Sequence, residues 1–291
     1  MPSRNPSCFS FAISTVQPFF LWLSTLIFCP WVSASAPIDL TYELIEQRPL
    51  PQNAFTQGLS IHNGQLYLSS GGWDNSFILH QPWPTSSQVP NNNEQSLNAN
   101  DSFNPKKSGI KAIEDFFAEG LTYDENQLTL LSWQAGKALQ IDPDTLNIKR
   151  TLNYQGQGWG LTHNPHFYIM SDGSDRLSFR HKKDFSLSHR LKVKGGQRRW
   201  QRLNELEYFS GLIWANIWQE NIIIAINPST GKVHGILNLS KIVANEKQRD
   251  PDSVLNGIAY DTDHQALWIT GKRWRHVYRI SITNLPKMQT P

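Results

Sequence analysis

Short apolar runs that end in small or polar residues recur along the chain, and each follows a similar four-residue motif. The motifs occupy residues 56–59, 118–121, 158–161, 203–206 and 255–258. The runs that follow them occupy residues 66–70, 128–132, 167–171, 212–216 and 267–271. Four copies of the motif carry glycine at the third position, and the fourth copy along the chain carries Glu205 there. The pattern predicts one structural unit repeated five times.

The repeat predicts an all-β fold, a five-bladed β-propeller. Successive motif positions lie 40 to 62 residues apart, a range that suits blades of four strands. Helical repeats fit less well, because the units consist of short apolar or aromatic runs bounded by Asn, Asp, Gly and Pro. Residues 142–145 and 227–231 have the composition of hairpin turns between a third and a fourth strand.

The last repeat offers only three strands, at residues 256–260, 266–270 and 276–282. The alternating segment 41–45 has no blade of its own. We therefore expect this N-terminal segment to supply the fourth strand of the last blade and so to close the ring. We place the propeller domain at residues 37–291, with the polar segment 82–110 as a surface insertion rich in Pro, Asn and Ser.

The N-terminal residues predict a secretory signal peptide over positions 1–36. Arg4 precedes an apolar stretch at residues 19–32, and small residues follow at 33–36. A transmembrane anchor is the alternative, but the apolar stretch is short for a bilayer span and Pro30 interrupts it. We therefore expect an exported protein, periplasmic or secreted, with no membrane span in its mature form.

Composition narrows the class of partner. Both cysteines, Cys8 and Cys29, lie in the predicted signal peptide, so the mature chain is expected to have neither disulfides nor cysteine zinc sites. The whole chain has 27 basic and 24 acidic side chains, a balance that argues against a nucleic-acid partner. The basic run at residues 192–202 is the one candidate patch, and a solvated loop is the favoured interpretation.

Equivalent positions of the five repeats are expected to form rings, because the first strand of each propeller blade lines the central channel. The residues before the motif glycine form one ring: Gln57, Glu119, Trp159, Asn204 and Asn256. The residues that end the second strands form another: Gly71 near Trp73, Trp133, Asp172, Trp218 and Lys272. Taken singly, such tryptophans are often core residues, and such amides are often turn residues. Together they predict a mouth with aromatic walls, amides, one carboxylate and one ammonium.

Glu119 is the member of these rings with the clearest chemistry. A carboxyl group at the start of a channel-lining strand, between Phe117 and Leu121, is expected to be partly desolvated. Its pKa is then raised, and the group can exchange protons near neutral pH.

Eight separated segments carry a resemblance to a known family: residues 55–59, 117–122, 133, 158–161, 203–207, 214–218, 255–260 and 270–272. In these segments the chain resembles the glutamine cyclotransferases, the plant and bacterial type of glutaminyl-peptide cyclotransferase. The resemblance implies a five-bladed propeller, which agrees with the repeat count. It also implies that the N-terminal glutamine of a peptide or protein substrate is cyclised to pyroglutamate with release of ammonia. The insertion at 82–110 departs from the family pattern without touching the matching segments.

The resemblance also implies roles for individual residues. Glu119 matches the carboxylate that transfers protons. Lys272, Gln57 and Asn204 are candidates for stabilising the oxyanion, and the choice between them stays open. The expected walls, which would hold the glutamine side chain against its own amine, are Phe55, Phe117, Trp133, Trp159 and Trp218. The enzyme is expected to act as a monomer, without a cofactor or a metal ion.

Two other functions stay open on the sequence alone. A non-enzymatic propeller would bind peptides or glycans at the same aromatic mouth, and the fold does not distinguish it from an enzyme. A metal-dependent hydrolase would need several carboxylates near the axis, and only Glu119, Asp172 and Glu205 are candidates. The single acid among the amides of the first ring favours the cyclotransferase.

Overall fold

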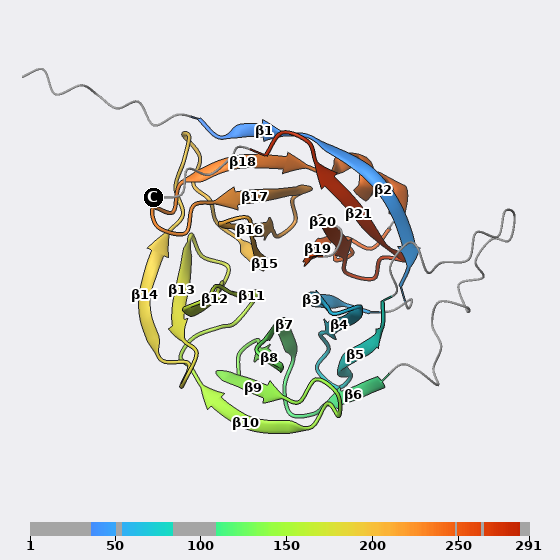
Figure 1. The fold of residues 1–291 in the computed structure, drawn as a ribbon, viewed down its shortest axis with the longest axis vertical. Coiled ribbons are helices and arrows are strands. Elements are labelled where there is room, and N and C mark those ends of the chain that lie inside the picture. Colours follow the sequence, from blue (N-terminus) through green and yellow to red (C-terminus); the bar gives the residue numbers. More distant parts are fainter. Residues whose placement is uncertain (1–35, 51–53, 84–108, 248, 263–264, 286–291) are drawn as a thin grey trace, which may run out of the picture. The chain divides into compact units, whose positions relative to one another are not determined.

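The structure is a computed structural model that describes residues 36–50, 54–83, 109–247, 249–262 and 265–285. These residues belong to one compact unit, Ala34–Pro291, and form many β-strands and one short α-helix. Five sheets follow one another around a common centre (Figure 1). The five predicted repeats are therefore the five blades of a propeller.

We number the blades in chain order. Blade 1 consists of β3 (Thr56–His62), β4 (Gln65–Ser70), β5 (Ser76–Pro82) and β6 (Gly109–Ile113). Blade 2 consists of β7 (Ala118–Asp124), β8 (Gln127–Ser132), β9 (Lys137–Ile141) and β10 (Ile148–Asn153). Blade 3 consists of β11 (Leu161–His163), β12 (Phe167–Met170), β13 (Arg176–His181) and β14 (Leu187–Lys192). Blade 4 contains β15 (Leu203–Phe209), β16 (Leu212–Ile217), β17 (Ile222–Ile226) and β18 (Val233–Asn238), and blade 5 contains β19 (Leu255–Asp261), β20 (Ala266–Gly271) and β21 (His276–Ile282).

The N-terminal segment closes the ring, as predicted. Strand β2 (Tyr42–Pro49) pairs antiparallel with β21, from Tyr42 opposite Ile282 to Pro49 opposite His276, and is the fourth strand of blade 5. A second closing strand was not predicted. Strand β1 (Ile38–Leu40) pairs in parallel with β18 and gives blade 4 a fifth strand. The N-terminal segment thus ties blades 4 and 5 together along their outer edges (Figure 1).

The hydrophobic core lies between the blades. Each of its five clusters combines buried residues of two neighbouring blades, so both faces of every sheet are covered. The cluster between blades 4 and 5, for example, contains Trp214 and Ile223 together with Ile258 and Tyr278. This packing explains why second strands such as β12 and β16 are apolar along most of their length instead of alternating between apolar and polar residues.

The predicted hairpin turns are present. Asp142 Oδ1 accepts hydrogen bonds from the backbone N–H groups of Asp144 and Thr145, at 3.1 and 2.9 Å, in the turn between β9 and β10. Asn227 Oδ1 accepts the equivalent pair between β17 and β18, both at 2.9 Å. A short polar side chain that caps its own turn explains why these sequences were recognisable.

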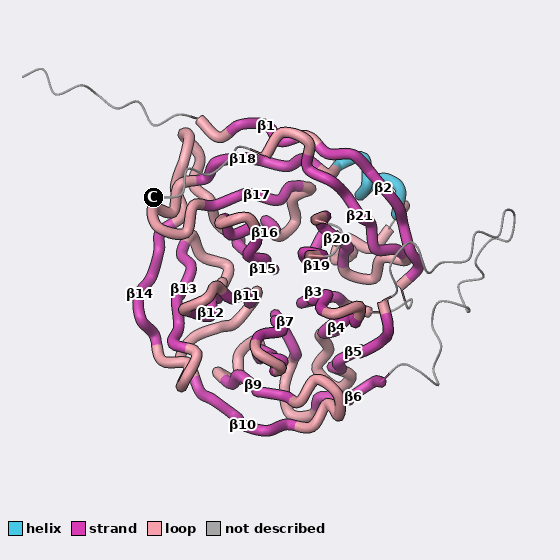
Figure 2. Tube along the Cα trace, in the orientation of Figure 1, coloured by secondary structure: helices cyan, strands magenta, loops and turns pink. Residues whose placement is uncertain are grey.

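Helix α1 (Ser240–Glu246) follows blade 4 and was not predicted (Figure 2). Its last residue, Glu246, is buried and accepts hydrogen bonds from the Arg275 backbone N–H at 2.9 Å and from the Tyr278 hydroxyl at 2.7 Å. The helix therefore supports the connection between β20 and β21, the segment that begins at Lys272.

Two predicted segments lie mainly outside the described residues. The predicted signal peptide, 1–36, includes only residue 36 of the described chain, and most of the predicted insertion falls in residues 84–108. The strands that border this insertion extend into it, because Pro82 belongs to β5 and Gly109 to β6. Across the described part of the chain, no helix combines the length and the apolar character that a membrane crossing needs.

Candidate active site

In blades 1, 2, 4 and 5 the repeated motif lies in the inner strand, where neighbouring blades come closest, whereas in blade 3 only its last residue, Leu161, belongs to β11. In β3, β7, β15 and β19 the pairing with the second strand shifts register within the motif, so each inner strand has a bulge there. A side chain at Gly58 would place its Cβ 2.3 Å from the Leu121 backbone nitrogen, and one at Gly120 would lie 2.5 Å from that of Leu161. Gly58 and Gly120 are therefore required by close backbone packing between blades.

Glu205, which replaces the glycine in blade 4, has a structural role instead. Its carboxylate is completely buried and accepts hydrogen bonds from the Ile258 backbone N–H at 2.8 Å and from the Leu59 N–H at 3.4 Å. These bonds join blade 4 to blades 5 and 1. Burial, and then the nearby Glu207 carboxylate, raise the pKa of Glu205 well above its ordinary value.

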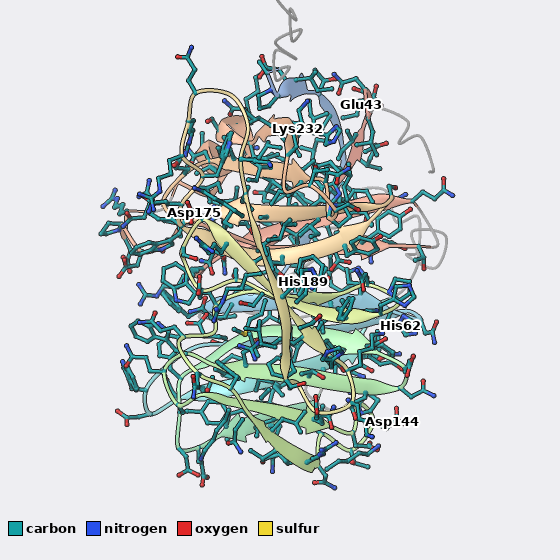
Figure 3. The ribbon with its side chains drawn as sticks, turned by 90° about the vertical axis from the view of Figure 1, so that its left-hand side faces the viewer. Glu43, His62, Asp144, Asp175, His189 and Lys232 are labelled. Carbon is teal, nitrogen blue, oxygen red and sulfur yellow. The ribbon has the colours of Figure 1, made fainter. Side chains whose placement is uncertain are left out.

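The candidate site lies on the face of the ring where the second strands end. In the side view of Figure 3, Asp175, between β12 and β13, lies toward one face, while His62, the last residue of β3, lies toward the other. Trp133 and Lys272 follow the second strands of their blades in the same way as Asp175. They therefore share its face.

The two predicted rings are connected by a repeated backbone hydrogen bond. In four blades the residue after the second strand donates its N–H to the carbonyl of the residue two positions before the first-ring residue. The pairs are Gly71 with Phe55, Trp133 with Phe117, Trp218 with Arg202 and Lys272 with Val254, at 2.9 Å each. Blade 3 departs from the pattern, because Ser171, the residue after β12, donates its N–H to the Gly160 carbonyl at 3.0 Å. The second-ring residue of this blade, Asp172, uses its Oδ1 to cap a local turn, accepting the Ser174 N–H at 3.0 Å.

Glu119 lies at the end of a chain of hydrogen-bonded amides. Its Oε1 accepts a hydrogen bond from Gln57 Nε2 at 3.2 Å, and Gln57 Oε1 accepts one from Asn256 Nδ2 at 3.4 Å. Asn256 Nδ2 also donates to the Thr56 carbonyl at 2.9 Å. All of these side chains are buried, and only 6% of Glu119 is exposed. The acid is therefore held in place by blades 1 and 5, although it belongs to blade 2.

Glu119 and Lys272 form the charged pair of the site. Burial raises the pKa of Glu119 to about 8, although the Lys272 ammonium group pulls it in the opposite direction. Burial likewise lowers the pKa of Lys272, against the effect of Glu119. The Lys272 Nζ atom lies 4.6 Å from the centre of the Phe55 ring, a cation–π distance. Near neutral pH the site can therefore both accept and deliver a proton.

Two amide oxygens of the first-ring residues have no hydrogen-bond donor among the described residues. They are the Oδ1 atoms of Asn204 and Asn256, and both are buried. A buried amide oxygen without a partner costs free energy of about 1–3 kcal/mol, so a ligand that supplies an N–H group there is favoured.

The predicted aromatic side chains form two groups, and Phe55 of the first group contacts Lys272. The rings of Phe55 and Phe117 meet edge to face with centroids 6.2 Å apart, and Phe117 and Trp133 meet at 5.6 Å. Trp159 and Trp218 form the second group at 5.7 Å. All five are partly exposed, as wall residues of a binding site must be.

Comparison with known proteins fits this geometry. Residues 21–282 match the family model described as glutamine cyclotransferase. The chain belongs to the glutamine cyclotransferase family. It is 29% identical to the glutaminyl-peptide cyclotransferase of Arabidopsis thaliana over 261 residues, which cover 86% of this chain and 75% of that protein. The crystal structure of Myxococcus xanthus glutaminyl cyclase superposes with a TM-score of 0.72 at 28% identity, covering 84% of this chain and 98% of that one.

Two further residues contribute to the aromatic groups: Gln157, which was not predicted, and Trp73, which the sequence analysis placed near the second ring. Gln157 Oε1 accepts hydrogen bonds from the indole N–H groups of both Trp133 and Trp159, each at 3.0 Å, and so links the two aromatic groups. Trp73 lies 5.7 Å from both Phe117 and Trp133. Trp73 had a signal in its position near the second ring, whereas Gln157 had none, because an exposed glutamine between two glycines resembles any loop.

No three His, Cys, Asp or Glu side chains of the described segments are grouped so that they could hold a metal ion. The three acids named as candidates for a hydrolase have separate surroundings. Glu119 is bonded to Gln57, Glu205 to backbone N–H groups of blades 1 and 5, and Asp172 to its own turn.

Proposed function

We propose that this chain is a glutaminyl-peptide cyclotransferase, which converts the N-terminal glutamine of a peptide or protein into pyroglutamate and releases ammonia. The observation that carries the proposal is Glu119, a buried carboxyl group with a pKa of about 8 set among amide side chains. Membership of the glutamine cyclotransferase family supports the same reaction.

The reaction is an intramolecular acyl transfer. The α-amine nitrogen of the substrate forms a bond to its side-chain carboxamide carbon, and the bond from that carbon to the amide nitrogen breaks. Glu119 takes the proton that the amine loses and delivers one to the departing nitrogen, so the carboxyl group ends the cycle as it began. A pKa of about 8 suits this work, because an α-amino group has a pKa of about 7.7–8.0.

Negative charge develops on the carboxamide oxygen during attack, and we propose that Lys272 stabilises it. The Lys272 ammonium is buried beside Phe55 and interacts electrostatically with Glu119, so little water screens its charge. The amide N–H groups of Gln57 and Asn204 are further candidate donors. The acceptor Oδ1 of Asn204 suits the substrate amine, because it is buried and without a partner among the described residues.

The aromatic walls would supply orientation. A free glutamine side chain has several rotatable bonds, and only a folded conformation brings the amine to the carboxamide. We propose that the folded conformation is enclosed by Phe55, Phe117, Trp133, Trp159 and Trp218. The amine would then be held close to the carboxamide carbon, and this orientation would accelerate the intramolecular attack.

Proton transfer and charge stabilisation are sufficient for this reaction, so we propose that it proceeds without a metal ion or cofactor. We also retain the proposals that the protein acts as a monomer and is exported after removal of a signal peptide that ends at Ala34 or Ala36. Each can be tested separately from the reaction.

The deciding experiment measures ammonia release and loss of the free N-terminus from a short peptide that begins with glutamine. Matched peptides that begin with Nα-acetylglutamine or with asparagine serve as controls, because the first has a blocked amine and the second cannot form the same five-membered ring. Turnover of the glutamine peptide alone is expected. Binding of all three peptides without turnover would instead establish a non-enzymatic peptide-binding propeller.

A further inference from the structure

Trp73 is the most exposed large hydrophobic residue in the described chain, with 61% of its surface accessible. It lies in the connection between β4 and β5, and both ends of this connection are anchored. Gly71 N–H donates to the Phe55 carbonyl at 2.9 Å, and the Ser76 hydroxyl donates to the Gly72 carbonyl at 2.6 Å. The exposed indole is therefore presented by a fixed turn.

Trp73 continues the aromatic wall outward from the proposed catalytic pair. Its ring meets Phe117 at an interplanar angle of 68° and Trp133 at 43°, with both centroids 5.7 Å away. Phe117 in turn contacts Phe55, which lies under the Lys272 ammonium. The aromatic residues thus run from the buried Lys272 to a largely exposed Trp73. An isolated exposed tryptophan would need no explanation, but one joined to a binding wall does.

The substrate supplies a reason for this extension. The proposed reaction consumes only the first residue of a peptide, and the rest of the peptide must leave the site toward solvent. An extended chain advances about 3.3–3.6 Å per residue. The Trp73 ring lies 5.7 Å beyond the rings of Phe117 and Trp133. The one or two substrate residues that follow the N-terminal glutamine could therefore reach it.

From this continuity we infer that Trp73 is a specificity-determining residue, which stacks against the side chain of the residue after the N-terminal glutamine and favours an aromatic residue there. The inference rests on the proposed cyclotransferase activity. Stacking of two aromatic rings is worth roughly a two- to tenfold change in an equilibrium or rate ratio.

The test compares kcat/KM for two substrates, Gln-Phe-amide and Gln-Gly-amide. The wild-type protein is expected to prefer the first by roughly two- to tenfold. Trp73→Ala should bring the ratio close to one, and Trp73→Phe should retain most of it. Ile148→Ala is the matched control, because Ile148 is half exposed on β10, the outer strand of blade 2, and its loss should leave the ratio unchanged.

The outcomes separate this inference from the proposed function. Turnover of neither substrate by the wild type would overturn the proposed function itself. If the wild type turns over both substrates with equal kcat/KM, only the role of Trp73 is overturned, and no variant is needed to see this. A preference that survives in Trp73→Ala would likewise overturn that role alone. A loss of rate by the same factor for both substrates would show that Trp73 supports the wall without choosing the substrate.

Discussion

Replacement of Glu119 by glutamine is the sharpest test of the proposed chemistry. The change keeps the size of the side chain and an oxygen that can accept from Gln57 Nε2, now 3.2 Å from Glu119 Oε1. It removes the only titrating group among the first-ring residues. General acid–base catalysis is typically worth about 10²–10⁴-fold, so kcat should fall by that factor while KM changes far less.

The pH profile of kcat/KM should change shape as well as height. The reacting pair of Glu119 and substrate amine needs one proton between them, and the two groups have pKa values near 8. The wild type should therefore show a bell centred near pH 8. In Glu119→Gln only the amine still titrates, so the residual activity should rise with pH and then level off.

The same substitution should stabilise the fold. The pKa of Glu119 is raised from 4.5 to about 8 on folding, so the folded protein binds more protons than the unfolded chain between these values. The free energy of unfolding of the wild type therefore falls as pH rises from about 4.5 to 8. At pH 7 the cost is at most about 3 kcal/mol, which Glu119→Gln removes. Its melting temperature should exceed that of the wild type by a margin that grows from pH 5 to pH 8.

Glu207→Gln is the matched control. Glu207 is another inner-strand glutamate whose pKa burial raises to about 8, and its Oε1 accepts the Tyr260 backbone N–H at 3.1 Å. Its replacement should stabilise the fold in the same pH range while kcat is retained. The assignment of Glu119 is refuted if Glu119→Gln turns over within a few-fold of the wild type or keeps the bell-shaped profile.

Three further predictions test closure, the walls and metal dependence. Deletion of residues 1–50 removes β1 and β2 and exposes the edges of β18 and β21. The melting temperature should therefore fall sharply relative to that of a protein that lacks only residues 1–35. Equal melting temperatures would contradict closure of the ring by these strands. Gln157→Leu removes the acceptor of two indole N–H groups and should raise KM by roughly three- to tenfold. Gln157→Glu keeps an acceptor and should retain a KM close to that of the wild type. Unchanged kinetics in Gln157→Leu would show that the two tryptophans keep their positions without this residue. Dialysis against a strong chelator should leave activity unchanged, and zinc-dependent recovery of lost activity would revive a metal mechanism.

The propeller could be predicted because its signals are local and repeated. Each blade carries the same motif and the same apolar second strand, and the structural reason for the motif glycine is the same in blades 1 and 2. The closing strand β2 could be predicted because it alternates and because blade 5 lacked a strand. Hairpin turns could be predicted because Asp142 and Asn227 cap their own turns.

The elements that were missed lack such signals. Strand β1 has only three residues, and its pairing with β18 depends on a contact nearly 200 residues away. Helix α1 has seven residues, no side-chain cap at its N-terminus, and Lys247 in the left-handed conformation at its C-terminal end, where glycine is usual. Gln157 is informative only once two indole groups from different repeats meet on its oxygen, which no spacing along the chain reveals.

The closure of the ring and the chemistry of the site are linked, because Lys272 in blade 5 meets Phe55 in blade 1 at the seam. A backbone hydrogen bond crosses this seam from Arg273 N–H to the Ala54 carbonyl at 2.8 Å. The first repeat thus contributes an aromatic wall residue, Phe55, and the last repeat contributes the ammonium group of Lys272 to the same site. Burial of Glu119 destabilises the fold when its carboxyl group is ionised, so other contacts must hold the neighbouring blades in place. The pairing of β2 with β21, which closes the ring at blade 5, supplies such contacts.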